Sequence, residues 1–147
     1  MYIYIRLYFE KSEKNPSMYN VDIWNEEYKK INEKTNCKAK LFRLEDKEAL
    51  RTEIADSVIF TNGTGMGMKP YVGQTYIEKD MLRPDLIVSD VVYQPAKTRL
   101  LELAEEVGCP TINGLGMMLF QGAEAFKCWT GQEMPIDHMK EFLFGDK

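Results

Sequence analysis

The chain has 147 residues, 44% of them hydrophobic and 29% charged, with a formal net charge of −4. These values are ordinary for a globular domain, and an acidic balance argues against nucleic acid, which normally meets a basic protein face. No apolar run approaches the roughly 20 residues of a membrane span, and the amino terminus lacks the basic-then-apolar order of a signal peptide. We therefore expect a single cytoplasmic domain without nucleic-acid or membrane partners.

Strand-like and helix-like segments alternate along the chain, which favours a mainly parallel sheet covered by helices. Strand patterns lie at residues 2–8, 39–43, 57–61, 86–92 and 110–112. The first helix pattern is capped by Asp22 and ends near residues 35–36. The second is shorter and is capped by Asp46. The remaining helix patterns lie at residues 97–107, 115–129 and 136–144. Residues 13–20 are expected to form a loop, and residues 69–84 a long connection with only a turn of helix.

The sequence offers little sign of thiol, histidine or metal chemistry. Cys37, Cys109 and Cys128 are odd in number and lack the spacing of a metal or redox pair. We expect reduced, mostly buried thiols, as in a cytoplasmic protein. His138 is the single histidine, has no partner acid in view and is expected at the surface.

The most informative segment follows the fourth strand pattern. An apolar run ends in Asp90-Val91-Val92-Tyr93, a proline follows at position 95, and a helix pattern begins at once. Buried parallel strands deliver side chains to a ligand crevice at their carboxyl ends in this way. The Tyr93 phenol could bind a polyol or a carboxylate there, although an ordinary packed aromatic is the simpler interpretation.

Two glycine-rich turns follow other strand patterns. The first is Thr61-Asn62-Gly63-Thr64-Gly65-Met66-Gly67, and the second is Asn113-Gly114-Leu115-Gly116. Neither has the G-x-G-x-x-G spacing of a phosphate-binding loop. Glycines let a backbone approach a ligand closely. A plain tight turn is the simpler interpretation of the first segment, and in the second a strand-to-helix turn and a ligand contact are compatible.

In this order and at these separations, the three motifs resemble the shikimate and quinate dehydrogenases over roughly residues 37–144. The resemblance implies an α/β fold, a Rossmann-like three-layer sandwich with an incomplete doubly wound, mainly parallel sheet. It also implies NADP or NAD as cofactor. The amino-acid sequences of the two glycine-rich turns resemble the quinate/shikimate branch of the family more than the strictly biosynthetic branch. Residues implied near the nicotinamide are Thr61, Asn62, Gly65, Val91, Val92 and Gly114.

The same resemblance implies a substrate site for a shikimate- or quinate-like ring. Tyr93 would reach the cyclohexane ring, and so would Gln121 in the motif Leu119-Phe120-Gln121-Gly122-Ala123. Trp129, before Thr130-Gly131, matches a family helix end and is given a packing role.

Three parts of the family pattern have no match in this sequence. These are a substrate domain with a lysine and aspartate acid–base pair, a first strand with its glycine-rich pyrophosphate turn, and a convincing ribose selector, for which Arg6 is the nearest candidate. We therefore expect residues 1–147 to form a partial NAD(P)-binding domain without the amino-terminal substrate domain. It would have no catalytic or metal-binding residues of its own, its cofactor binding would be weak or lost, and the choice between NAD and NADP stays open.

The missing first strand leaves a gap in the centre of the order 3-2-1-4-5-6, and we expect residues 2–8 to fill it beside residues 57–61. Apolar residues of the last two helices, around 119–129 and 136–144, would then be exposed. Such patches predict a homo-oligomer or a complementing substrate-domain chain.

Three functions remain open at this point. The chain could be an oxidoreductase of this family, a non-catalytic binding or assembly module that keeps the fold, or one piece of a split enzyme. An assay of the purified chain with shikimate or quinate and both cofactors separates the first from the other two.

Overall fold

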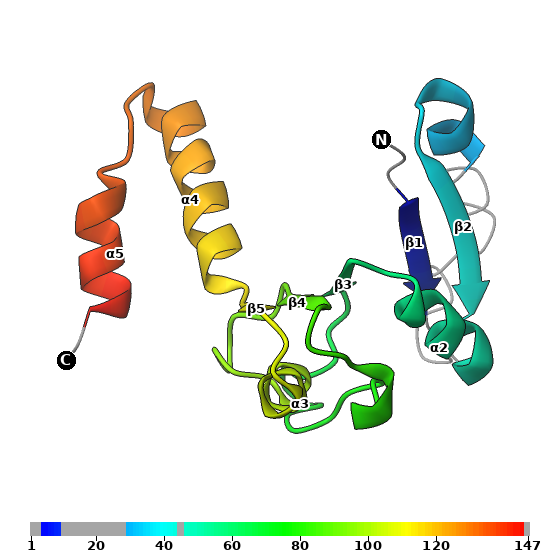
Figure 1. Ribbon diagram of the computed structural model, residues 1–147. Helices are drawn as coiled ribbons and strands as arrows, with labels where there is room; N and C mark the ends of the chain where they lie inside the picture. The colour runs from blue at the N-terminus through cyan, green and yellow to red at the C-terminus, as the bar shows by residue number, and fades with distance from the viewer. Residues whose placement is uncertain (1–3, 10–28, 44–45, 146–147) are drawn as a thin grey trace. The chain divides into compact units, whose positions relative to one another are not determined.

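The computed structural model describes residues 4–9, 29–43 and 46–145, which belong to two compact units, Met1–Asp56 and Ser57–Lys147 (Figure 1). The described elements of the first unit are β1 (Tyr4–Phe9), helical residues 29–34, β2 (Lys38–Arg43) and α2 (Lys47–Ala55). The second unit contains β3 (Ile59–Asn62), the short 3-10 helix η1 (Lys79–Met81), β4 (Ile87–Asp90), α3 (Arg99–Val107), β5 (Thr111–Ile112), α4 (Leu115–Thr130) and α5 (Ile136–Phe144).

All strand pairs in the described part of the chain are parallel. In the first unit β1 pairs with β2, in register from Tyr4↔Lys38 to Phe9↔Arg43. In the second unit β4 lies between β3 and β5 and pairs with both. Parallel strands joined through helices confirm the predicted α/β class with a mainly parallel sheet.

The expected position of residues 2–8 beside residues 57–61 is wrong. β1 pairs with β2, and among the described strands β3 pairs only with β4, so that β3 forms an edge of its sheet. Strands that follow each other in sequence usually pair, and β1 and β2 do so here. In the order 3-2-1-4-5-6, a break at strand 1 leaves one piece of two strands and one of three, which is the pairing observed.

Local capping fixes where the helices begin and end. The Asp46 carboxylate accepts a hydrogen bond from the Ala49 amide at 3.0 Å, as predicted for the start of α2. α3 begins at Arg99, two residues later than predicted, because the Thr98 hydroxyl caps it and leaves residue 97 outside. Gly108, at φ 90°, ends α3 as expected.

The remaining predictions concern the helix before β2, the loop at residues 13–20 and the connection between β3 and β4. The helix at residues 29–34 ends where predicted, with the Thr35 amide donating to the Ile31 carbonyl. Its start, the proposed Asp22 cap and the loop at residues 13–20 lie outside the described part. The connection at residues 69–84 carries one short helix, η1, as predicted.

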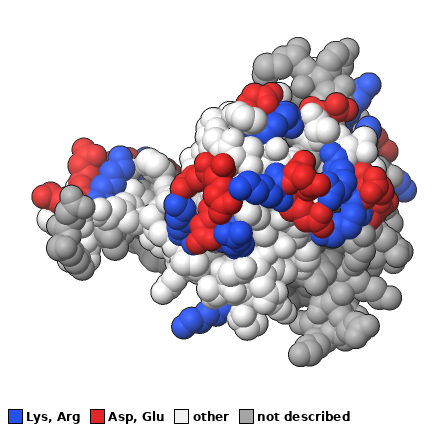
Figure 2. Space-filling model, turned by 60° about the horizontal axis from the view of Figure 1, so that its bottom comes forward, with Lys and Arg blue, Asp and Glu red and all other residues white. Residues whose placement is uncertain are grey.

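The core of the second unit lies between its sheet and α3. Leu86 and Val88 are fully buried, and the apolar stripe of α3 packs beside β4 and β5 through Leu100, Leu101 and Ala104. The opposite face of α3 carries ion pairs, among them Arg99 with Glu102 and Lys79 of η1 with Glu106. Figure 2 shows acidic and basic side chains interspersed on this side of the molecule. None of the described helices combines the length and apolar character needed to cross a bilayer.

Helices α4 and α5 lie side by side and run in opposite directions (Figure 1). Leu119 and Ala123 of α4 are buried, but Trp129 is 84% exposed. Its expected packing role is therefore wrong, although Gly131 does end α4. Phe120 and Phe142 are also exposed, so these helices present apolar surface.

The three cysteines differ in burial and none of them forms a disulfide. Cys109 is buried, Cys37 is half-buried and Cys128 is exposed, so the expectation of mostly buried thiols is wrong. The Cys109 thiol donates to the Arg83 carbonyl at 3.1 Å, and burial raises the pKa of this thiol above its usual value. His138 lies on the surface, as predicted.

The difference in burial between Cys109 and Cys128 predicts selective alkylation. At pH 8 a smaller fraction of Cys109 is thiolate, because its pKa is raised, and its sulfur is shielded from solvent. We expect N-ethylmaleimide to modify Cys128 at least about tenfold faster than Cys109, as measured by peptide mass spectrometry. Equal rates in the folded chain would contradict the burial of Cys109, and unfolding in urea should equalise them.

Candidate functional site

The candidate site lies at the carboxyl ends of β3, β4 and β5. Because these strands are parallel, their carboxyl ends meet at one edge of the sheet. Asn62 ends β3, Asp90 ends β4, and the loop through Gly114 follows β5. Three motifs that are far apart in the sequence therefore come together at this edge.

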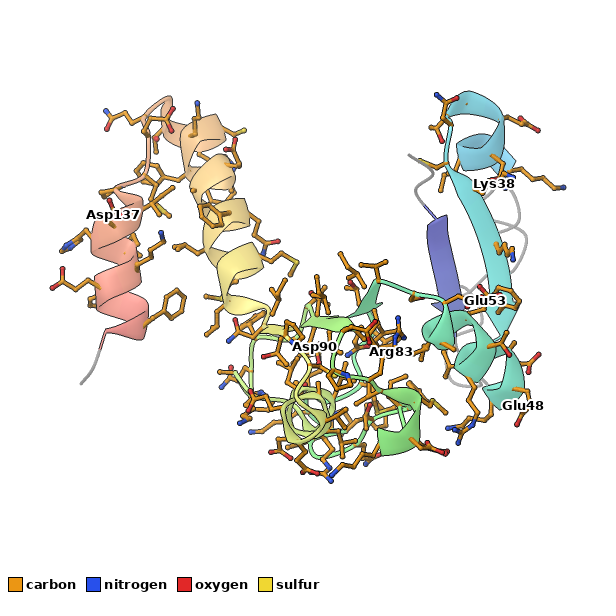
Figure 3. The ribbon with its side chains drawn as sticks, viewed as in Figure 1. Lys38, Glu48, Glu53, Arg83, Asp90 and Asp137 are labelled. Carbon is orange, nitrogen blue, oxygen red and sulfur yellow. The ribbon has the colours of Figure 1, made fainter. Side chains whose placement is uncertain are left out.

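The Asp90 carboxylate is the centre of this region. Its side chain is buried, with 1% of its surface exposed, among the side chains of the second unit (Figure 3). One oxygen, Oδ2, accepts from the Thr98 hydroxyl at 2.6 Å. The other, Oδ1, accepts from the Val92 amide at 2.9 Å and from the Asn62 side-chain amide at 3.0 Å. One carboxylate thus joins the end of β3, the loop after β4 and the first turn of α3.

The Asn62 side chain shapes the glycine-rich turn. Its Nδ2 donates to the Met66 carbonyl at 3.0 Å as well as to Asp90. Its Oδ1 accepts from both the backbone amide and the hydroxyl of Thr64, at 3.1 and 2.7 Å. An amide side chain has two donor hydrogens and two acceptor lone pairs, so these four bonds use its full capacity. Asn62 therefore holds the turn in place, and its side chain has no hydrogen bond left for a ligand.

Gly114 allows two loops to pass at very short range. Its amide donates to the Val92 carbonyl at 3.2 Å. A Cβ atom added at this glycine would lie 2.2 Å from the Val91 carbonyl oxygen and 2.8 Å from the Val92 carbonyl carbon. The loop after β5 can approach the loop after β4 in this way only if residue 114 has no side chain.

The structure brings together most of the residues predicted near the nicotinamide. Asn62, Val91, Val92 and Gly114 are linked by backbone or side-chain contacts, since the Val91 amide donates to the Asn62 carbonyl at 3.0 Å. Val92 and Gly114 are buried and Val91 is half-buried, whereas Thr61 and Gly65 are exposed on β3 and in the turn.

The two predicted substrate residues stand apart from this network. Tyr93 follows β4 and is 46% exposed, and Gln121 is exposed on α4. Within the described part of the chain, no hydrogen bond joins either side chain to the other or to Asp90.

Sequence reasoning gave no role to Asp90 or Thr98, the two residues at the centre of the site. A signal was present: the acid ends an apolar strand pattern, and a threonine stands eight residues later, just before the apolar stripe of a helix. A threonine in that position is a preferred helix cap, and here its hydroxyl also donates to the buried acid.

The turn after β3 has room for a bound group. A Cβ added at Gly63 would meet nothing within 4 Å, and one at Gly65 would meet only the Met68 side chain, at 3.7 Å. The backbone of this turn is therefore open at Gly63 and Gly65. Flat, partly apolar rings such as a nicotinamide fit beside a glycine backbone with buried valine next to it, so the residues present fit this cofactor.

Comparisons with known proteins agree with this geometry. Residues 114–143 match the family model described as "Shikimate 5'-dehydrogenase C-terminal domain". A shikimate dehydrogenase (NADP(+)) of Listeria innocua is 70% identical over 116 residues, which are 78% of this chain and 40% of that protein. The shikimate dehydrogenase (NADP(+)) of Streptococcus uberis is 52% identical over 120 residues, 80% of this chain and 41% of that one.

Solved structures give the same result. The shikimate 5-dehydrogenase of Listeria monocytogenes, in complex with shikimate and NAD, matches 97% of this chain at 57% identity with a TM-score of 0.84, over 47% of its own length. This chain belongs to the shikimate/quinate dehydrogenase family. The quinate dehydrogenase of Corynebacterium glutamicum, in complex with NAD, is a more distant member at 33% identity and a TM-score of 0.62, matching 70% of this chain and 35% of its own length. The chain spans about 40% of the length of the curated relatives described above.

The close approach at Gly114 generates a prediction. We expect Gly114→Ala to lower the free energy of unfolding by at least about 1–3 kcal/mol, the usual effect of overpacking, because the new Cβ would overlap backbone atoms. Gly116→Ala is the matched control: a Cβ there meets nothing within 4 Å, and alanine in a helix should stabilise by roughly 0.5–1 kcal/mol. Urea unfolding followed by circular dichroism measures both. Equal effects of the two substitutions would contradict the close approach.

Proposed function

We propose that this chain supplies the nicotinamide-facing and substrate-facing side of an NADP-linked shikimate dehydrogenase. The observation that carries this proposal is the convergence of the Asn62 turn, the Val91–Val92 loop and Gly114 around Asp90, at the carboxyl ends of three parallel strands. The family membership supports the reaction class, since the relatives are named shikimate dehydrogenases. Under this proposal, residues 1–147 are part of the nicotinamide-binding domain.

The proposed reaction is the reversible oxidation of a ring hydroxyl of shikimate to a ketone. When bound, the nicotinamide cofactor would supply the hydride acceptor for the ring carbon, and the hydroxyl proton would pass to a base. The exposed backbone of Gly65 and the Thr61 side chain would contact the nicotinamide on one side. The loop through Val91, which Gly114 packs against, would contact it on another, and buried Val92 would help to exclude water.

Tyr93 and Gln121 are proposed to bind the substrate. Both side chains are exposed, and the described part of the chain records no hydrogen bond for either. A phenol and an amide can donate to the carboxylate or the hydroxyls of a shikimate-like ring. Their position in the family motifs is what directs us to this ligand.

We propose that the base in this reaction belongs to the lysine and aspartate pair of the family's substrate domain, which has no match in this sequence. Asp90 is unsuitable, because it is buried and already accepts three hydrogen bonds. General acid–base catalysis contributes about 10²–10⁴-fold in rate, so we propose that the chain by itself has negligible turnover. Loss of only about 4 kcal/mol of contacts weakens binding about a thousandfold, and we therefore propose millimolar ligand affinities for the isolated chain.

Cofactor, location and assembly complete the proposal. NADP is the first cofactor to test because the curated relatives are named for it, although the Listeria monocytogenes structure contains NAD. A cytoplasmic location is proposed from the three free cysteines and from the enzyme relatives. Homo-oligomerisation remains a prediction, and the exposed apolar side chains of α4 and α5 favour it.

Saturation-transfer NMR with shikimate tests this proposal at millimolar concentrations. We expect a weak signal that Tyr93→Phe reduces about threefold to tenfold, since one hydrogen bond contributes roughly 0.5–1.5 kcal/mol. Tyr71→Phe is the matched control, because Tyr71 is similarly exposed, at 49%, but lies outside the candidate site. The same effect from both substitutions would reject the substrate site, and micromolar binding or turnover by the chain alone would reject the proposed dependence on further residues.

A further inference from the structure

The loop between β4 and α3 carries Tyr93 and is attached at both ends to the Asp90 carboxylate. At its start, the Val92 amide donates to Oδ1 of Asp90 at 2.9 Å. At its end, the Thr98 hydroxyl donates to Oδ2 at 2.6 Å, a length typical of strong, charge-assisted hydrogen bonds. Asp90 and Thr98 are each only 1% exposed. One buried carboxylate therefore closes the loop that carries a proposed substrate residue.

Between these two attachments the loop has little other support. Among the described residues, no backbone-to-backbone hydrogen bond involves residues 93–97. Lys97 forms an ion pair with Glu105 of α3, but both side chains are about half exposed, and exposed ion pairs contribute little to stability. The course of residues 93–97 therefore depends on the two hydrogen bonds to Asp90.

Thr98 also connects this loop to the glycine-rich turn after β3. A Cβ atom placed on Gly67 would lie 3.2 Å from both Cβ and Cγ2 of Thr98. The methyl side of Thr98 therefore lies against Gly67, while the hydroxyl reaches Asp90. Because the two groups on Cβ have different contacts, valine and serine substitutions at position 98 separate the role of the hydroxyl from that of the methyl group.

We propose that Thr98 is a positioning residue for the substrate: its hydroxyl, through Asp90, holds the loop so that the Tyr93 phenol lies where a shikimate-like ring binds. The inference rests on the proposed function, which assigns the substrate contact to Tyr93. Tyr93 is 46% exposed, so the loop backbone, not packing around the ring, sets its place. A binding group that is ordered before the ligand arrives avoids the free-energy cost of ordering it on binding.

Backbone ¹⁵N relaxation of the purified chain tests the order of the loop directly. In the unmodified chain we expect order parameters of about 0.85 for the amides within residues 93–97, the value of a rigid backbone. Thr98→Val keeps the shape of the side chain but lacks the donor, so these values should fall below about 0.6. Thr98→Ser keeps the hydroxyl and should keep the loop ordered. A flexible loop in the unmodified chain would overturn the inference, and that measurement does not depend on a variant that folds.

Saturation-transfer NMR with shikimate connects the loop to binding. We expect Thr98→Val to weaken binding by about threefold to tenfold, as Tyr93→Phe does, and Thr98→Ser to stay within about twofold of the unmodified chain. Because Thr98 acts through Tyr93, the double variant should lose less than about twofold beyond Tyr93→Phe alone. A purely structural role of Thr98 would instead give independent effects that multiply, to about tenfold or more, and this result would overturn the inference.

Lys97→Met is the matched control in the same loop. It removes the ion pair with Glu105 and leaves both hydrogen bonds to Asp90 in place. We expect less than a twofold change in shikimate binding and unchanged order parameters within residues 93–97. A loss as large as that of Thr98→Val would show that the loop responds to any change, and it would contradict the specific role of the Thr98 hydroxyl.

The outcomes separate this inference from the proposed function. If the unmodified chain does not bind shikimate, the proposed substrate site is rejected, while a loop that is ordered in the unmodified chain and mobile in Thr98→Val still supports the positioning of Tyr93. If Tyr93→Phe weakens binding but Thr98→Val does not, the proposed function stands and the inference is overturned. An ordered loop in Thr98→Val overturns the inference as well.

Discussion

The structure of the second unit depends on one buried carboxylate. A charged group that is taken out of water is tolerated when hydrogen bonds replace the lost hydration, and Asp90 receives three of them. Hydrogen bonds to charged groups contribute roughly 1.5–3 kcal/mol each, which is large compared with the stability of a small domain. Thr98 and Asn62 also bond to other groups, so Asp90 sets the position of α3 and of the glycine-rich turn together.

The arrangement around Asp90 shows how a small sheet could hold part of the proposed binding site. Three loops leave the carboxyl ends of the strands, and each one is attached either to Asp90 or, through Gly114, to its neighbouring loop. Val91 and the turn after β3 are thereby fixed, while Tyr93 and Gln121 extend into solvent. Under the proposed function, the fixed part would contact a flat cofactor ring, and the extending part would contact a second ligand that further residues would help to enclose.

Periodicity predicted most elements of the fold, because the spacing of apolar residues reflects the face that each element buries. It placed α4 and α5 within a residue of their observed ends and all five strands within a few residues. It did not predict the exposure of Trp129, because an apolar stripe shows which face of a helix avoids water without showing what covers that face. The pairing of β1 was also missed, since strand order depends on contacts between distant segments.

The candidate site was predictable only in part, for a related reason. The motifs around Gly65, Val91 and Gly114 were visible as turns after strand patterns, and the structure brings them to one edge of the sheet. The hydrogen bond between Thr98 and Asp90 joins residues eight positions apart through a sharp bend, and no regular period shows such a contact. The family resemblance placed Asn62 near the nicotinamide, but the four hydrogen bonds that occupy its side chain were not visible in the sequence.

A double-mutant cycle between Asp90 and Thr98 tests the central role of the buried carboxylate most directly. Asp90→Asn, Thr98→Val and the double variant would be compared by native-state hydrogen exchange at the Val88 amide, which bonds to the Pro110 carbonyl in the centre of the sheet. The account predicts a favourable coupling of at least about 1 kcal/mol in the free energy of opening, within the usual range for residues in one hydrogen-bond network. Independent, additive effects of the two substitutions would contradict it.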